Sequence, residues 1–176
     1  MGYIGQQITT VFPTSISVDT ATITTANISN QLTDANMSAG SIIQIINAST
    51  TTEVATTSSS FSDTGVTATI TPSSTSSKIF IIYTLHKFIN ASGATSDTKL
   101  LRGSTELLTT GYMVYNGGST VMAQGTHHFL DSPSTTSATT YKVQFNSRDN
   151  SSDVRVVYDD SAGNASSFIT LMEIAQ

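Results

Sequence analysis

Short apolar runs that alternate with threonine and serine recur along this chain and predict β-strands. The clearest is residues 66–71, in which Val, Ala and Ile occupy every second position and Thr the positions between. This period of two is typical of a strand with one buried and one solvated face. Pro72 and the serines after it favour a turn. Residues 79–83 then form a continuous apolar run suited to the middle of a sandwich, so the module indicates a compact β-domain.

Further strand signals follow one another closely after Gly40. Residues 102–106 suit a tight hairpin connection and residues 115–119 a wider one. Many short strands with turn signals between them predict an all-β, antiparallel sandwich, and most simply a jelly roll. We expect strands at residues 42–47, 53–56, 66–71, 78–85, 99–102, 106–109, 121–123, 127–131, 141–146, 153–158 and 168–174.

Residues 1–40 have a different pattern. Their apolar positions are sparse, separated by Thr, Ser, Asp and Asn, and too few to close a core within one chain. Such a segment is either a flexible tail or ordered by packing on other chains, and the regular spacing of its Ile, Val and Leu residues favours the second. We therefore predict an extended N-terminal segment, residues 1–40, followed by a jelly-roll β-sandwich domain, residues 41–176.

The composition fits one ordered β-domain. A chain of 176 residues can bury one good core. Only 11% of the residues are charged, and the abundance of Ser and Thr would suggest disorder if apolar residues were scarce. At 38% hydrophobic, with those residues in short alternating runs, order is the better interpretation. Because the chain has no cysteine, disulfides and thiolate metal sites are excluded.

The charge distribution argues against nucleic-acid and membrane partners. The formal net charge is −5, and every Lys and Arg lies at or after Lys78, so no basic face is visible that could displace phosphate counterions. No apolar run approaches the roughly 18 residues that span a bilayer. The first residues also lack the apolar region of a signal peptide. We expect a soluble protein without membrane insertion.

Metal binding is the first chemistry that the sequence raises. His127 and His128 are adjacent, with His86 and Asp131 as further candidate ligands. Neighbouring side chains of a strand point to opposite faces, so the pair cannot easily hold one ion. A three-fold axis could instead gather one His from each of three chains. A packed or hydrogen-bonded pair is the better interpretation, and we expect no metal and no cofactor.

Acidic residues raise calcium binding and glycoside hydrolysis. Residues 149–153 lack the acidic spacing and central glycine of an EF-hand loop, so they and the pair Asp159 and Asp160 are interpreted as solvated turn acids. Asp131, Asp159 or Glu173 could meet in space as paired carboxylates, but no pattern singles out a pair. Nucleophile-elbow, dinucleotide and zinc-protease motifs do not occur in the sequence. We expect that the protein is not an enzyme.

Loops on a rigid sandwich usually carry recognition. Tyr112, Tyr115 and Asn116 are residue types that can stack on sugars and hydrogen-bond to them, so they are candidate receptor contacts. Tyrosines at a subunit interface are an equally good interpretation. The long connections that could form the distal tip are residues 90–97, 111–120 and 131–139.

Several motifs are shared with a known class of proteins. Tyr3-Ile-Gly5, Phe61-Ser-Asp-Thr-Gly65 and residues 70–79 resemble virion fibre proteins of tailed bacteriophages, particularly marine ones. The resemblance covers nearly the whole chain and carries no catalytic signature. The strand order is similar to that of a tumour-necrosis-factor-like or complement-head-like jelly roll, through residues 78–85, 101–104, 128–131, 141–145 and 169–174.

The resemblance implies a homotrimeric structural protein of the virion, made in the host cytoplasm. Its N-terminal part would attach to other virion proteins, and its β-domain would face outward. Trimerisation would also give the weakly apolar N-terminal segment a surface to bury against. The residues implied for attachment are Tyr3, Ile4, Gly5, Phe12, Ile16 and Val18.

The sequence leaves four functions open. We favour a short fibre that exposes its β-sandwich for attachment to host-surface glycans. The first alternative is a capsid decoration or cement protein that stabilises the phage head. A free carbohydrate-binding module, acting as a monomer, is a further alternative, and a glycan-cleaving enzyme is the least favoured.

Overall fold

The computed structural model describes residues 37–115, 118, 120–158 and 165–176, and the regular structure within them is entirely β-strand. The all-β class expected from the sequence is confirmed. The strands are β1 (Ile42–Thr50), β2 (Val54–Thr56), β3 (Ser62–Ile70), β4 (Lys78–Ile89), β5 (Thr95–Arg102), β6 (Thr105–Tyr115), β7 (Val121–Asp131), β8 (Thr139–Phe145), β9 (Val154–Val156) and β10 (Ser167–Ile174).

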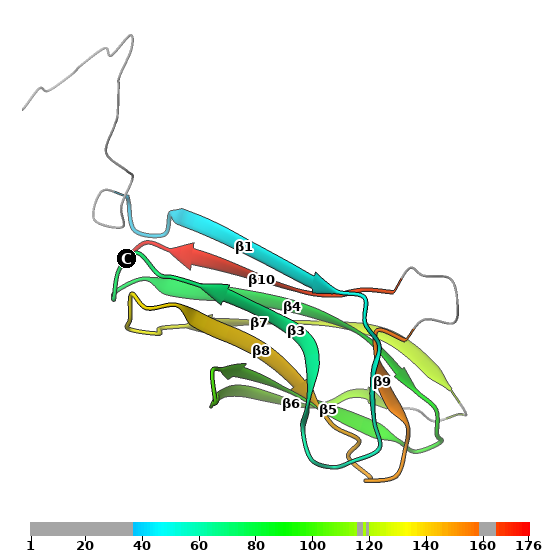
Figure 1. Ribbon diagram of the computed structural model, residues 1–176. Helices are drawn as coiled ribbons and strands as arrows, with labels where there is room; N and C mark the ends of the chain where they lie inside the picture. Colours follow the sequence, from blue (N-terminus) through cyan, green and yellow to red (C-terminus); the bar gives the residue numbers. More distant parts are fainter. Residues whose placement is uncertain (1–36, 116–117, 119, 159–164) are drawn as a thin grey trace, which may run out of the picture. The chain divides into compact units, whose positions relative to one another are not determined.

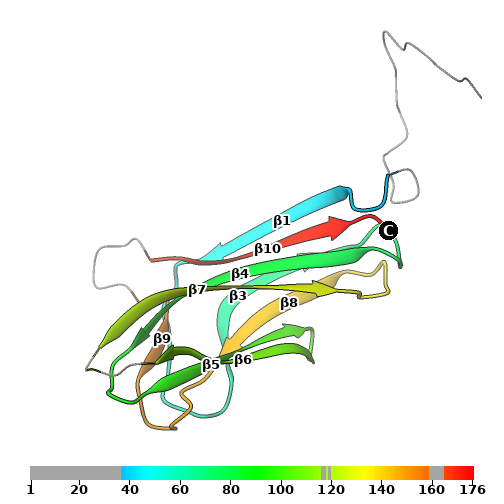
Figure 2. The same ribbon diagram turned by 180° about the vertical axis from the view of Figure 1, so that it is seen from behind.

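The strands form two antiparallel sheets that lie face to face (Figures 1 and 2). Sheet I has the order β1-β10-β4-β9-β2, with β7 also paired to β4, and sheet II has the order β3-β8-β5-β6. The long strands pair as nested hairpins: β5 with β6, β4 with β7, β3 with β8, and β1 with β10. A long hairpin rolled up in this way is a jelly roll, so the predicted antiparallel jelly-roll sandwich is confirmed.

β4 is the central strand of sheet I. One of its edges pairs with β7 along residues 79–89. The other edge is shared, because β10 pairs with residues 78–84 and β9 with residues 87–89. Since β9 also pairs with β2, the two shortest strands extend sheet I only beside the second half of β4.

The core lies between the sheets and is filled by every second residue of the long strands. In β4 the inward positions alternate with more exposed ones, as the period of a strand requires. Each large apolar side chain buried in this way contributes roughly 1.5–3 kcal/mol. The core residues that are 0–1% exposed include Val66, Ile70, Ile79, Ile81, Leu85, Leu100, Val143, Phe145, Ile169 and Leu171.

One strand expected as two pieces is continuous. Residues 121–123 and 127–131 both belong to β7, because Gln124, Gly125 and Thr126 continue the ladder with β4. The local preferences of Gln-Gly-Thr, above all of the glycine, predict an interruption of the strand at these residues. Pairing with a long, well-packed partner strand overrides that local preference.

Two of the expected loops are shorter than the sequence suggested. β6 runs on to Tyr115, so the first half of the expected connection 111–120 is strand. β5 begins at Thr95, which shortens the expected loop 90–97. The connection between Asp131 and Thr139 is a loop, as expected.

Candidate functional site

The outer face of sheet I carries a continuous row of apolar side chains. The register places Ile45 of β1 beside Met172 of β10. Met172 lies beside Phe80 of β4, and Phe80 beside Leu130 of β7. Directly paired residues point to the same face of a sheet, and this face is the outer one, since Ile45 is 56% and Leu130 50% exposed. We call these four residues the apolar row.

The two rows nearer the middle of sheet I carry no Asp, Glu, Lys or Arg. The first runs from Asn47 through Thr170 and Ile82 to His128, and Nδ2 of Asn47 donates to Oγ1 of Thr170 at 2.8 Å. In the second, the hydroxyls of Thr84 and Thr126 hydrogen-bond to each other at 2.8 Å, next to the exposed ring of Phe168. These two rows therefore hold no side chain with a fixed charge, whereas Lys78 beside Ile174 and Arg155 beside Phe88 lie toward the two ends of the sheet.

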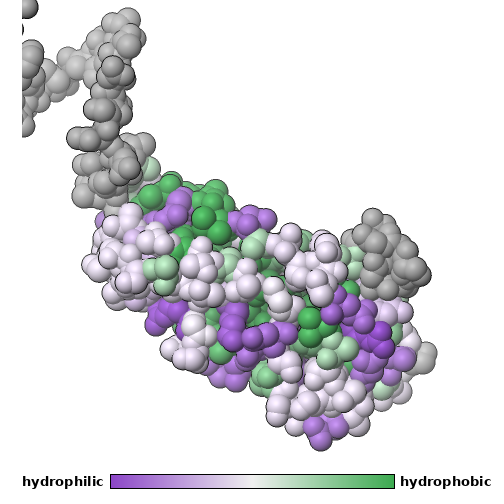
Figure 3. Space-filling model, viewed as in Figure 1, coloured by the Kyte–Doolittle hydropathy of each residue, from purple (hydrophilic) through white to green (hydrophobic). Residues whose placement is uncertain are grey.

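The outer face of sheet II is polar. The row that crosses its four strands consists of Asp63, Gln144, Lys99 and Thr109. Nζ of Lys99 lies 2.8 Å from Oε2 of Glu106, so the charges on this face are partly paired. Figure 3 shows mostly pale and purple residues over β3 and β8, whereas green, hydrophobic residues gather over the start of β1. The sandwich thus has two unlike outer faces.

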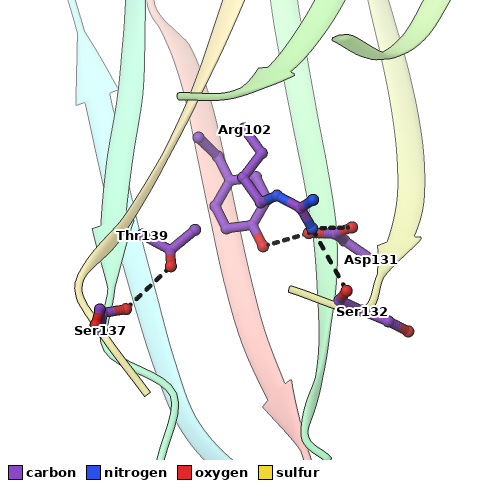
Figure 4. A network of polar contacts seen from close by, with 6 residues as sticks. Arg102, Asp131, Ser132, Ser137 and Thr139 are labelled. Atoms are coloured by element: carbon purple, nitrogen blue, oxygen red, sulfur yellow. Dashed lines mark hydrogen bonds and ion pairs between the residues drawn. The ribbon is translucent and has the colours of Figure 1, made fainter. Parts of the chain in front are cut away.

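Asp131 links the two sheets at one end of the sandwich (Figure 4). Nη1 of Arg102 donates to both carboxylate oxygens of Asp131, at 2.9 and 2.8 Å, and the hydroxyl of Tyr141 donates to Oδ2 at 2.7 Å. Burial and the hydrogen bond to Asp131 raise the pKa of Tyr141. Asp131 is therefore held in a structural network with Arg102 and Tyr141, and its carboxylate is not free to join His127 or His128 as a metal ligand.

Glu173 is a second buried carboxylate with its own partners. It is fully buried, and its Oε1 accepts hydrogen bonds from the backbone N–H and hydroxyl of Ser73 and from the hydroxyl of Ser77, each at 2.7 Å. Oε2 accepts from the amide of Gln44. Burial raises the pKa of Glu173, but the hydrogen bonds from Gln44, Ser73 and Ser77 outweigh it and leave the pKa lowered. The carboxylate fixes the turn before β4 to sheet I.

Lys87 is an inward-facing lysine of β4, and sequence reasoning missed it. Its side chain is fully buried, and Nζ donates to Oγ of Ser96 on β5 at 2.8 Å. This hydrogen bond joins the two sheets. Burial lowers the pKa of Lys87 to about 7, although the charge of Asp97 opposes this shift. The protonation of Lys87 therefore changes near neutral pH.

His127 and His128 lie on opposite faces of β7, as the strand period predicted. The ring of His127 lies 5.6 Å from that of Tyr83, a core residue, and the ring of His128 lies 5.8 Å from that of Phe80 in the apolar row. Burial, and then the charge of Lys87, lower the pKa of His127. In the described residues no group of three His, Asp or Glu side chains could hold a metal ion.

The loop acids hold local structure. The carboxylate of Asp149 accepts hydrogen bonds from the backbone N–H groups of Ser151 and Ser152 and from the hydroxyls of Ser147 and Ser152. Asp153 accepts from Arg155 at 2.8 Å. Asp159 and Asp160 lie outside the described residues.

Among the described residues, no helix is long and apolar enough to cross a membrane.

Few of the residues expected to make contacts can be placed. Asn116 lies outside the described residues. Tyr112 and Tyr115 lie in β6 rather than in a loop, which corrects their expected position; the description does not extend to their side chains. The attachment residues outside the described part are Tyr3, Ile4, Gly5, Phe12, Ile16 and Val18.

The apolar face of sheet I could have been found from one signal in the sequence. Residues 79–83 are apolar at every position, and residues 168–174 are apolar at every position except Thr170 and Glu173. Such a run indicates a strand covered on both faces. The run at residues 79–83 was interpreted as suited to the middle of the sandwich, and that interpretation accounts for one face of the strand only.

Comparisons with known proteins give little further information. No family model matches the chain, and no curated protein matches it by sequence. One match among solved structures is the structure of the infectious bursal disease virus Gx strain, with 11% identity and a TM-score of 0.35. The match covers 75% of this chain and 36% of that chain, so this chain spans about a third of the matched protein. A likeness of this strength carries no argument about function.

Proposed function

We propose that the chain is a structural protein of a virion that assembles as a homotrimer through the outer face of sheet I. The apolar row carries this proposal. A contiguous apolar patch on the surface of a monomer usually marks an interaction site. The row crosses four strands, and the two rows on its inner side contain no Asp, Glu, Lys or Arg; the row on its other side contains one charged residue, Lys78 beside Ile174. The centres of protein interfaces are likewise depleted of charge and rich in Met and Phe.

A second copy of the same chain is the occupant that best fits this face. Most soluble oligomers are homo-oligomers with closed symmetry. The nested pairing of the jelly roll agrees with the sequence resemblance to the tumour-necrosis-factor-like and complement-head-like class, whose members are typically homotrimers. That resemblance favours a three-fold axis over a two-fold one.

The virion role follows from the resemblance to phage fibre proteins. In this arrangement residues 1–40 attach the trimer to other virion proteins. Sheet II and the loops face outward, toward host-surface glycans. A polar outer surface whose charges are largely paired suits this position because it resists nonspecific association.

The oligomeric state of the full chain tests the assembly. We expect a trimer by multi-angle light scattering. Leu130→Asp places a charge in the apolar row and should shift the population to monomer by at least about tenfold, equivalent to roughly 1.4 kcal/mol or more. Thr140→Asp, at an exposed position on the outer face of sheet II, should leave the trimer intact. A monomeric wild-type chain, or a trimer unaffected by Leu130→Asp, would contradict the proposal.

The fibre role makes a separate prediction about adsorption. Particles whose protein carries Tyr112→Ala and Tyr115→Ala should keep the trimer and adsorb to host cells several-fold more slowly, because aromatic contacts to sugars are lost. Thr69→Ala on sheet II is the control and should adsorb normally. Unchanged adsorption in the double variant, together with fragile particles when residues 1–40 are removed, would indicate a decoration protein of the head. Glycan binding by a stable monomer would favour a free carbohydrate-binding module.

A further inference from the structure

A bulge in β3 opens a small cavity on the outer side of sheet II. The pairing of β3 with β8 passes from Asp63 opposite Gln144 to Thr67 opposite Lys142, so three residues of β3 face one residue of β8. Gly65 lies within the bulge at a φ of 80°, a conformation that favours glycine. The cavity measures about 130 Å³ and is lined by Asp63, Gly65, Val66, Thr67, Lys142 and Val143.

The bulge is held in place by its own hydrogen bonds. The hydroxyl of Thr64, a buried side chain, donates to the carbonyl of Val143 at 2.8 Å. The hydroxyl oxygen of Thr64 also accepts a hydrogen bond from the backbone N–H of Val66 at 3.0 Å. Bulges often occur next to functional sites, where they redirect side chains. Here the cavity is part of the folded strand and needs no ligand to form.

The mouth of the cavity carries donors and an acceptor side by side. The carboxylate of Asp63 accepts from Nε2 of Gln144 at 2.7 Å and lies 3.0 Å from Nζ of Lys142. Burial raises the pKa of Asp63, but the hydrogen bonds from Gln144 and Lys142 outweigh it and lower the pKa. Asp63 is therefore ionised at neutral pH, and its charge is balanced by Lys142.

The walls are apolar where the mouth is polar. Val66 and Val143 are only 1% and 0% exposed and point into the core, so the accessible hydrocarbon of the lining comes from Gly65 and from carbon atoms of Asp63, Thr67 and Lys142. Small-molecule sites typically combine such walls with a few placed polar groups, and pockets for drug-sized ligands run from about 300 Å³ upward. This cavity is smaller, which restricts it to a ligand of about one ring. Because Asp63 and Lys142 balance, either sign of net charge on the ligand would meet one repulsive group.

We propose that this cavity binds one neutral sugar ring, as the terminal residue of a glycan. The C–H face of the ring would cover Gly65 and the hydrocarbon stem of Lys142. One hydroxyl would donate to Asp63, and a neighbouring hydroxyl would accept from Lys142. The inference deepens the proposed attachment role and rests on it for the source of the glycan. The site lies on sheet II, away from the apolar row, and stays open in the trimer.

Amide chemical shifts of the full-length, isotope-labelled protein test the site. Glucose, galactose, mannose and N-acetylglucosamine are titrated separately into the millimolar range. At least one should shift the amides of residues 63–67 and 142–144 in a saturable way. Lys142→Met should weaken that binding about tenfold or more, and Asp63→Asn should do the same. Thr140→Ala, on the same strand and face, is the matched control and should bind as the wild type does.

A variant is compared with the wild type only if its spectrum shows the wild-type fold. Two independent substitutions are used so that the test still stands if one of the variants does not fold. If none of the four sugars shifts these amides, or if both folded variants bind normally, the site is overturned. Light scattering on the same samples separates this result from the proposed assembly. A trimer that binds no sugar contradicts the site alone, whereas a monomer that binds sugar at these residues supports the site and contradicts the assembly.

Discussion

Lys87 is held between the sheets by contacts from several strands. Its ammonium donates to Ser96 of β5, with the charge of Asp97 on the same strand and His127 on β7 nearby. Burying an ammonium is costly unless it is fully compensated, which is why its pKa falls to about 7. The free energy of unfolding therefore depends on pH, because the pKa of the same amine is about 10.5 in the unfolded chain.

The sign of the pH effect follows from the two pKa values. Between about pH 7 and pH 10.5 the unfolded chain binds more protons at Lys87 than the folded one does, so the free energy of unfolding rises with pH across this window. Below pH 7 both states are protonated and the contribution of Lys87 is at its minimum. In urea unfolding, the gain in stability from pH 7 to pH 10 should be roughly 2–4 kcal/mol larger for the wild type than for Lys87→Met. Equal gains in the two proteins would show that the amine is solvated.

The long strands show how far local patterning predicts elements. Alternation in residues 66–70 correctly identified the core face of β3. The end of β4 was missed because His86 and Lys87 are polar, although Lys87 continues the inward set that begins at Ile79. Only the opposite strand, with its Ser96 hydroxyl, shows why a lysine fits there. Local sequence does not contain that partner.

The candidate sites were less predictable than the strands. The apolar row brings together residues from β1, β10, β4 and β7, so it exists only once the register is known. The cavity of sheet II depends on a bulge at Gly65, which the sequence marks with a glycine but does not distinguish from a turn. By contrast, the opposite orientation of His127 and His128 followed from the strand period alone.

The bulge of β3 gives a prediction for that element. Gly65→Ala should lower the free energy of unfolding by about 1–2 kcal/mol, because an L-residue with a Cβ is strained at positive φ. An added Cβ would meet Oγ1 of Thr50 only at 3.6 Å, so the cost is conformational rather than steric. Gly65→Asn is the matched variant and should lose less, since Asn tolerates this region. If urea unfolding shows that both variants lose the same free energy of unfolding, the loss comes from side-chain packing and not from backbone strain.

The whole molecule combines one outer face that is apolar and uncharged in its middle with one polar outer face. If the trimer forms through sheet I, hydrophobic burial and not ion pairing stabilises it. Raising NaCl to about 1 M, where the Debye length is about 3 Å, should leave the trimer fraction unchanged or higher by sedimentation velocity, and sulfate should increase it. Dissociation by NaCl would instead indicate an interface built on charged groups.

The position of β10 also has a consequence for the order of events during synthesis. β10 lies between β1 and β4, so the last of the ten described strands to be made fills a gap between two that are made earlier. Until residues 167–174 leave the ribosome, the facing edges of β1 and β4 have no partner, and apolar surface on both remains exposed. Open strand edges are prone to wrong association, and pairing between distant parts of a chain is slow. The nascent chain thus depends on the polar residues spread through its early strands to stay soluble while it waits for its last strand.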